Sequence, residues 1–269
     1  MPHRPFLRRL APALAAAATI FAAACRETPP PPPSQPQAPQ PEPSASRDGP
    51  PSLPIPQPPL DREALLTAAF QVASASVSGA DERQLQDDLG GERFVFRFRF
   101  GCGGPSDQGP RRWTYDEERE VLRARFSPAL DLTEAGQDER EDEASVLAFS
   151  VERPWLLRSA CPAGATELQG EPSDGRVRLV QWFTGEESRA TRLPDVFQLT
   201  ERTAPENAPR EGLELALSGT LEAGADGRVI ACALPPGGGR PDCTISVSIE
   251  TAVLQDPVSG AELARWGDP

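Results

Sequence analysis

The sequence predicts a mainly β protein, an antiparallel β-sandwich or partly open barrel with one N-terminal amphipathic helix. Residues 94–100 alternate Phe with Val or Arg, a period of two that is typical of a strand with one buried face. Many later segments also have strand character, and clusters of Gly, Pro and Asp separate them at short intervals.

The predicted elements follow in chain order. Asp61 is placed to cap a helix over 61–78, and a short helical turn over 81–89 follows it. The helix has an apolar stripe made of Leu65, Leu66, Ala69, Phe70, Val72, Ala73 and Val77. The strand over 94–100 is followed by a glycine-rich turn at 101–105. Strands are expected at 113–115, 122–126, 145–151, 176–184, 195–200, 211–221, 228–234 and 243–254.

The first 24 residues have the organisation of an export signal. Three arginines form a positive n-region, residues 10–21 form a short apolar stretch rich in alanine, and Ala22-Ala23-Ala24 leads to Cys25. This arrangement resembles the signal of bacterial lipoproteins, which is cut before a cysteine that then carries lipid. The resemblance implies lipidation of Cys25 and a protein anchored in the cell envelope, facing the periplasm.

Two residues near the cleavage site bear on the expected location of the protein in the envelope. Arg26 stands where lipoproteins retained at an inner membrane often have Asp, so the resemblance favours the outer membrane. Ala22 stands where a lipobox usually has a larger aliphatic residue, so the alternative is ordinary cleavage after Ala24 and a soluble periplasmic protein.

The remaining chain divides into a linker and a folded part. About half of residues 29–59 are proline, so 25–60 is predicted to be a disordered spacer that cannot bury a core. Residues 61–269 are sufficient for a single β-rich domain with its leading helix at 61–78.

Charge and composition exclude several functions. Loss of the signal leaves 24 Arg against 40 Asp and Glu, a net charge of about −16, which argues against a nucleic-acid partner. The chain has no lysine, and its one histidine, His3, leaves with the signal. A Ser-His-Asp triad, a histidine metal site and a Schiff-base lysine are therefore excluded. We expect no cofactor and no metal.

The cysteines predict two disulfides. With Cys25 assigned to lipid, four cysteines remain, an even number in an oxidising compartment. The loop 235–241 predicts a hairpin that sets Cys232 opposite Cys243 on the buried side, together with Ile230 and Leu234. Three pairings of the four cysteines are possible, and the hairpin favours the one that leaves Cys102 to pair with Cys161 by elimination.

Two charged segments are candidate sites. If the strands over 94–100 and 122–126 pair, Arg97, Arg99, Arg123 and Arg125 form a stripe that could bind an anionic envelope polymer or a lipid headgroup. The alternative is a solvated sheet face balanced by nearby acids. The acidic segment 131–143 partly matches a calcium loop at Asp131, Thr133, Gly136 and Asp142, but a mobile acidic loop fits it better.

Three functions remain. The leading hypothesis is a non-enzymatic, lipid-anchored β-domain that binds or scaffolds an envelope polymer or protein. The second is a carboxylate-dependent hydrolase of envelope glycans, for which Trp155 and Trp182 would lie beside polar groups as in sugar sites. These two tryptophans are more simply explained as core residues at strand ends. The third is a carrier of a small apolar ligand.

Overall fold

The computed structural model describes residues 57–128, 145–161, 176–183, 193–224, 226–234 and 239–267. The predicted signal peptide, Cys25, most of the spacer and the acidic segment 131–143 lie outside these residues. The described part of the chain contains no helix with both the length and the apolar character that a membrane-spanning segment needs.

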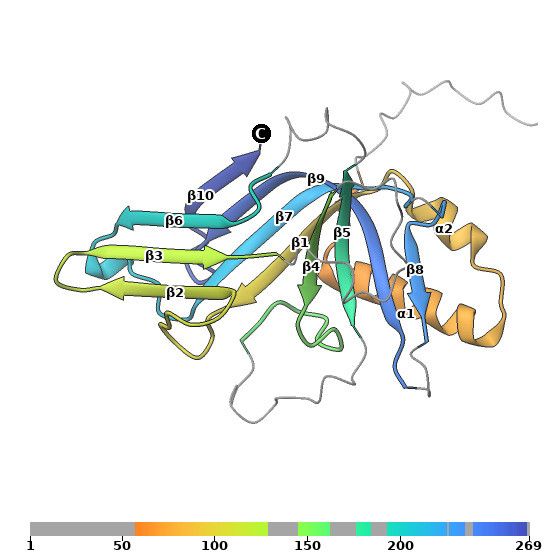
Figure 1. Cartoon of the computed structure of the whole chain (residues 1–269), viewed down its shortest axis with the longest axis horizontal. Helices are drawn as coiled ribbons and strands as arrows, with labels where there is room; N and C mark the ends of the chain where they lie inside the picture. Colours follow the sequence, from red (N-terminus) through yellow and green to blue (C-terminus); the bar gives the residue numbers. More distant parts are fainter. Residues whose placement is uncertain are drawn as a thin grey trace, which may run out of the picture. The chain divides into compact units, whose positions relative to one another are not determined.

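The described residues form a mainly β structure in which two sheets do not close into a barrel (Figure 1). The helices are α1 (Arg62–Ser78), α2 (Arg83–Leu89) and the 3-10 turn η3 (Pro205–Asn207). The strands are β1 (Arg93–Phe100), β2 (Arg111–Asp116), β3 (Val121–Phe126), β4 (Ser145–Val151), β5 (Val177–Phe183), β6 (Phe197–Arg202), β7 (Leu213–Leu221), β8 (Ile230–Ala233), β9 (Asp242–Gln255) and β10 (Glu262–Gly267).

The large sheet is built around the long strand β9, in the order β1-β7-β9-β5-β4, with β8 and β10 also paired to β9. Ser246 of β9 accepts a hydrogen bond from the Glu222 N–H and donates one to the Val229 carbonyl. Strands β7 and β8 therefore follow one another along the same edge of β9. On the other edge β10 is antiparallel, whereas β5 is parallel to β9, an exception to the antiparallel arrangement that the sequence predicts.

The small sheet has the order β2-β3-β6 and shares one core with the large sheet. Phe126 of β3 is central to this core. Its ring centroid lies 5.8 Å from that of Phe98 and 5.4 Å from that of Phe100, both on β1, and 6.1 Å from that of Phe149 on β4. One ring of the small sheet thus contacts rings from two strands of the large sheet.

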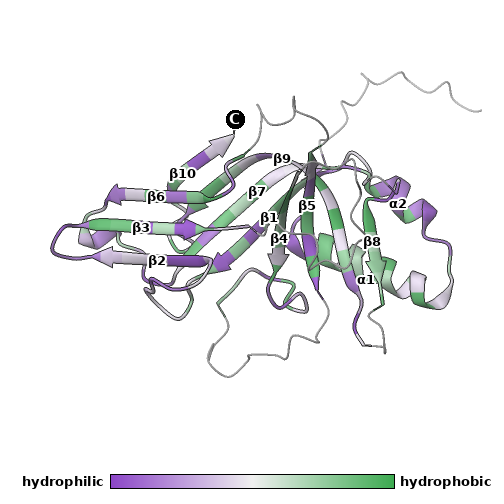
Figure 2. Ribbon diagram, in the orientation of Figure 1, coloured by the Kyte–Doolittle hydropathy of each residue, from purple (hydrophilic) through white to green (hydrophobic). Residues whose placement is uncertain are grey.

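Helix α1 begins and ends as its sequence predicts. The Asp61 side chain accepts a hydrogen bond from the Ala64 N–H, and Gly79 ends the helix in the left-handed conformation. The helix packs against β8, a mostly hydrophobic strand (Figure 2). The predicted apolar stripe is correct at Leu65 and its buried neighbours but wrong at Phe70 and Val77, which are 41% and 60% exposed. These two side chains lie outside the arc of the helix that the sheet covers.

Both predicted disulfides are present. Cys232 and Cys243 are directly opposite in the β8–β9 register and are bonded to each other, and Cys102 is bonded to Cys161. Leu234, predicted to share the buried face of Cys232, is instead 53% exposed just beyond the end of β8. The short helix and the nine expected strands are confirmed with small boundary shifts, whereas β10 was not predicted.

The position of Phe126 gives a stability test. Phe126→Ala should lower the free energy of unfolding by about 3 to 5 kcal/mol, because it leaves a cavity where the two sheets meet. Urea denaturation with both disulfides intact measures this loss. Phe70→Ala on the exposed side of α1 is the matched control, and equal losses for the two variants would contradict the described core.

Candidate anion-binding site

The loop that follows β4 forms one wall of a cavity. It leaves the strand at Val151 and reaches Cys161, whose disulfide to Cys102 fixes it beside the end of β1. Arg153 has a φ of 51°, a left-handed conformation that is uncommon for any residue other than glycine. The Leu156 N–H donates to the Arg153 carbonyl and closes a tight turn. Glu120, in the turn between β2 and β3, has a similar φ of 53°, so the conformation of Arg153 is that of a tight turn.

The opposite wall is the turn after β1. The Gly104 N–H donates to the Gly101 carbonyl, so the glycine-rich segment 101–105 forms the predicted turn. Gly101 has a φ of 68°, and the Trp113 ring occupies the space where a side chain would be placed. The Trp113 indole N–H donates to the Gly101 carbonyl at 3.2 Å, which holds the turn against β2.

The cavity has a volume of about 430 Å³ and a strongly basic lining. Five arginines and one carboxylate, Glu152, are among the described residues that line it. The arginines are Arg62, Arg99, Arg111, Arg153 and Arg158. This concentration of positive charge contrasts with the acidic composition of the whole chain. Cavities of this size are typical of small-molecule sites.

Arg111 of β2 is a buried cation, with a side chain 10% exposed. Its guanidinium lies 4.7 Å from the ring centroid of Phe126 and 5.6 Å from that of Phe98. It donates to the Ser150 carbonyl and, at 3.0 Å, to Oε1 of Glu152. Burial lowers the pKa of Arg111, and the nearby Glu152 opposes that shift.

Arg62, in the first turn of α1, holds the other end of the loop. It donates to the carbonyls of Leu156 at 3.0 Å and Glu152 at 3.2 Å, and it lies 5.1 Å over the Phe96 ring. Burial, followed by the charge of Arg111, lowers the pKa of Arg62 to about 10. Arg62 is therefore protonated at neutral pH but at a cost, which an anion bound nearby would reduce.

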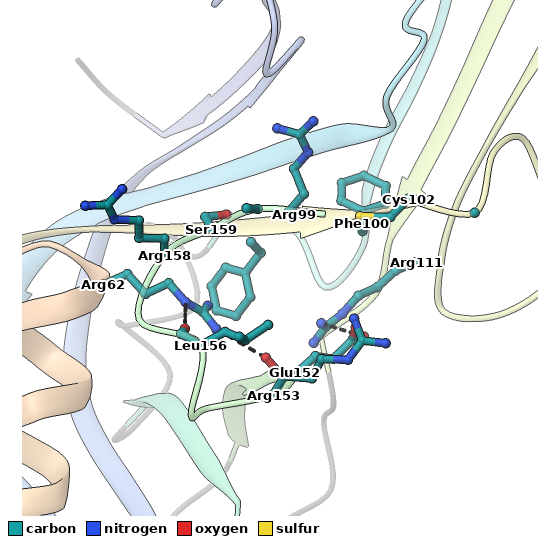
Figure 3. Close-up of a pocket in the computed structure, with 14 residues that line it drawn as sticks. Arg62, Arg99, Phe100, Cys102, Arg111, Glu152, Arg153, Leu156, Arg158 and Ser159 are labelled. Carbon is teal, nitrogen blue, oxygen red and sulfur yellow. Dashed lines mark hydrogen bonds and ion pairs between the residues drawn. The ribbon is translucent and has the colours of Figure 1, made fainter. Parts of the chain in front are cut away.

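The remaining arginines of the cavity differ in their surroundings. Arg153 and Arg158 have no ion pair with any residue of the described ranges. In Figure 3 the side chains of Arg62 and Arg111 extend toward Glu152, and Arg99 extends to the other side of β1. Arg99 donates to the Glu211 carbonyl at 3.1 Å, and its buried Nε has no hydrogen-bond partner within the described residues. Planar guanidinium groups suit carboxylate and phosphate oxygens.

The predicted arginine stripe does not form, because its two strands do not pair. Strand β1 pairs with β7, and β3 pairs with β2 and β6 in the other sheet. Arg97 and Arg99 form ion pairs with Glu214 at 3.0 Å and Glu211 at 3.4 Å. These two arginines therefore match the alternative of a sheet face balanced by acids. Arg123 and Arg125 lie on β3 in the small sheet, opposite Thr114 and Arg112 of β2.

Trp155 and Trp182, the two tryptophans considered for a sugar site, lie in different surroundings. Trp155 is not a core residue, since it is 39% exposed in the loop, where Arg240 lies 5.5 Å from its ring centroid. Trp182 is half-buried in β5 and donates to the Ser246 hydroxyl at 3.3 Å. The sequence placed Trp155 beside polar groups, but it did not predict that Arg62 and Arg111 both bind Glu152.

No group of His, Cys, Asp and Glu side chains in the described ranges could hold a metal ion. The residues of the calcium-loop pattern, Asp131, Thr133, Gly136 and Asp142, lie outside these ranges. Comparison with protein-family models, curated proteins and solved structures finds no match for this chain. The interpretation of the cavity as an anion site therefore depends on its geometry and charge.

The Cys102–Cys161 disulfide should control access to the loop. In a Cys102→Ser/Cys161→Ser variant the loop loses a crosslink that contributes about 4 kcal/mol on the loop-entropy model, so local opening becomes easier. Trypsin should then cut after Arg158 about ten times faster, whereas Pro154 protects the bond after Arg153. Mass spectrometry of timed digests measures the cut. A Cys232→Ser/Cys243→Ser variant is the control, and equal rates at Arg158 in both variants would contradict this role.

Proposed function

We propose that this protein is a non-enzymatic binding protein of the bacterial cell envelope that takes up a small phosphate- or carboxylate-bearing molecule in the arginine-lined cavity. The observation that carries the proposal is the charge balance around Glu152. Of two buried guanidiniums, Arg111 has an ion pair with the Glu152 carboxylate, whose side chain is 66% exposed, whereas Arg62 donates only to main-chain carbonyls within the described residues. Arg153 adds a further cation to the lining. Such a site lacks negative charge, and an anionic ligand would supply it.

The predicted export signal of the chain supports a role in the cell envelope. The first 25 residues resemble a lipoprotein signal, and the proline-rich spacer would separate a lipid on Cys25 from the folded part. The two disulfides are consistent with an extracytoplasmic domain. With a net charge of about −16, the protein would depend on its lipid rather than on electrostatic attraction to stay at an anionic membrane.

The cavity supports binding better than it supports the two alternative functions. Glycoside hydrolysis requires two carboxyl groups facing each other across the bond, and Glu152 is the one carboxylate among the described lining residues. An apolar ligand would have to enter a space lined by four arginines besides Arg99, whose side chain extends to the other side of β1. A multiply charged small anion matches these groups, because several guanidiniums can each contribute a charge-assisted hydrogen bond.

Calorimetric titration of the full-length mature protein tests the site. The panel is inorganic phosphate, glucose 6-phosphate, glucuronate and citrate, with glucose as the neutral control. Arg153→Gln/Arg158→Gln should weaken binding of the best anion about tenfold or more, because each charge-assisted hydrogen bond contributes about 1.5 to 3 kcal/mol. These two side chains make no ion pair in the described residues, so the fold should be unaffected.

Arg83→Gln/Arg93→Gln is the matched control, because it removes the same charge from side chains that are 89% and 74% exposed and lie away from the cavity. It should bind the anion as the unmodified protein does. Equal weakening in both double variants, or no anion binding by the unmodified protein, would contradict the proposal.

The anchor has a separate test. Protein extracted from the membranes of its native host should have a mass that exceeds that of residues 25–269 by a diacylglyceryl group and an acyl chain. Cys25→Ser should release the protein into the soluble periplasmic fraction. An unmodified chain beginning at Cys25 would instead support the soluble alternative, and it would leave the binding proposal unaffected.

A further inference from the structure

The outer face of the small sheet carries an ordered array of cations. Side chains alternate across each strand, with Trp113, Ala124 and Phe197 buried on the inner face. The outer face consists of three cross-strand rows: Arg112–Arg125–Gln198, Thr114–Arg123–Thr200 and Asp116–Val121–Arg202. Two arginines of the predicted stripe, Arg123 and Arg125, are thus combined with Arg112 and Arg202 rather than with Arg97 and Arg99.

These four arginines have little neutralisation from the protein. Within the described ranges none of them has a carboxylate oxygen within 4.0 Å, unlike Arg97 and Arg99 on β1. Asp116, the acid in the array, forms an ion pair with Arg119 at 3.0 Å, and hydrogen bonds from Arg119, followed by the more distant charge of Arg123, lower its pKa. Arg112 and Arg125 are direct cross-strand partners, an arrangement of like charges that destabilises a sheet. A bound anion would offset this repulsion.

The outer face of the small sheet also has a cavity, and its lining includes groups that can bind sugars. A cavity of about 270 Å³ is bordered by Arg112, Arg123 and Arg125 together with Thr114, Gln198 and Thr200. Asp107 is the one carboxylate among its described lining residues, so the lining keeps an excess of positive charge. Guanidiniums suit carboxylates or sulfates, and hydroxyl and amide groups suit sugar hydroxyls. Successive rows are about 7 Å apart along the strands, so a linear polymer with regularly placed charges can meet more than one row.

From these observations we infer that the outer face of β2-β3-β6 binds a linear acidic polysaccharide. A membrane surface fits less well, because the large apolar side chains exposed in the described part of the chain, such as Phe70 and Val258, belong to other elements. A peripheral membrane site would place apolar groups beside its cations. This surface is separate from the arginine-lined cavity, and the inference does not depend on the function proposed for that cavity.

Biolayer interferometry with the full-length mature protein tests the surface. The probes are polygalacturonate and dextran sulfate, with neutral dextran as the control polymer. Arg123→Gln/Arg125→Gln should weaken binding of the anionic polymers about tenfold, and it should reduce the dependence of affinity on salt. Melting temperatures confirm that the variant is folded, and Arg202→Gln, which changes one exposed side chain, provides a second and milder variant.

Matched controls separate this surface from general charge and from the cavity. Arg83→Gln/Arg93→Gln removes two positive charges elsewhere, and Arg153→Gln/Arg158→Gln changes the cavity; both should bind the polymers as the unmodified protein does. The inference is overturned if Arg123→Gln/Arg125→Gln binds equally well. It is also overturned if the face binds polyglutamate or phosphatidylglycerol vesicles but neither polysaccharide.

Discussion

The described structure depends on a buried guanidinium that joins its two sheets to the loop beside them. Arg111 belongs to the small sheet, yet it lies over Phe98 of the large sheet and over Phe126, the ring at the centre of the shared core. A cation is stable in such a place only if its donors are satisfied. The Ser150 carbonyl and the Glu152 carboxylate provide this, so the loop after β4 is held where the buried charge requires it.

The need to satisfy buried guanidiniums also makes the cavity positively charged. Arg62 binds two further carbonyls of the loop from the start of α1, which places a second cation next to the first. The cost of this arrangement is visible in the lowered pKa of Arg62, to which both burial and Arg111 contribute. An acidic protein thus concentrates positive charge in one partly enclosed space, where low-dielectric walls strengthen the attraction for an anion.

Local sequence patterns predicted most elements, but not the order in which they pair. The alternation of β1 and the loop between Cys232 and Cys243 were sufficient for a strand and a disulfide, because both are local features. The arginine stripe failed because β1 pairs with β7, far along the chain, rather than with nearby β3. Strand β10 was missed because its residues 262–265 favour a helix, and pairing with β9 and the contact of Trp266 with Phe197 override that preference. The cavity could not be predicted, since α1, β1, β2 and the loop meet only through tertiary packing.

The most direct test of the account is an NMR titration that follows the arginine Nε–Hε signals of the full-length mature protein. We predict that the signals of Arg62 and Arg111 exchange slowly with water in the free protein, because both groups are buried. They should shift saturably with glucose 6-phosphate but not with glucose. Rapid exchange of both signals, and no shift with any phosphate- or carboxylate-bearing compound, would contradict the existence of a buried, anion-binding arginine pair.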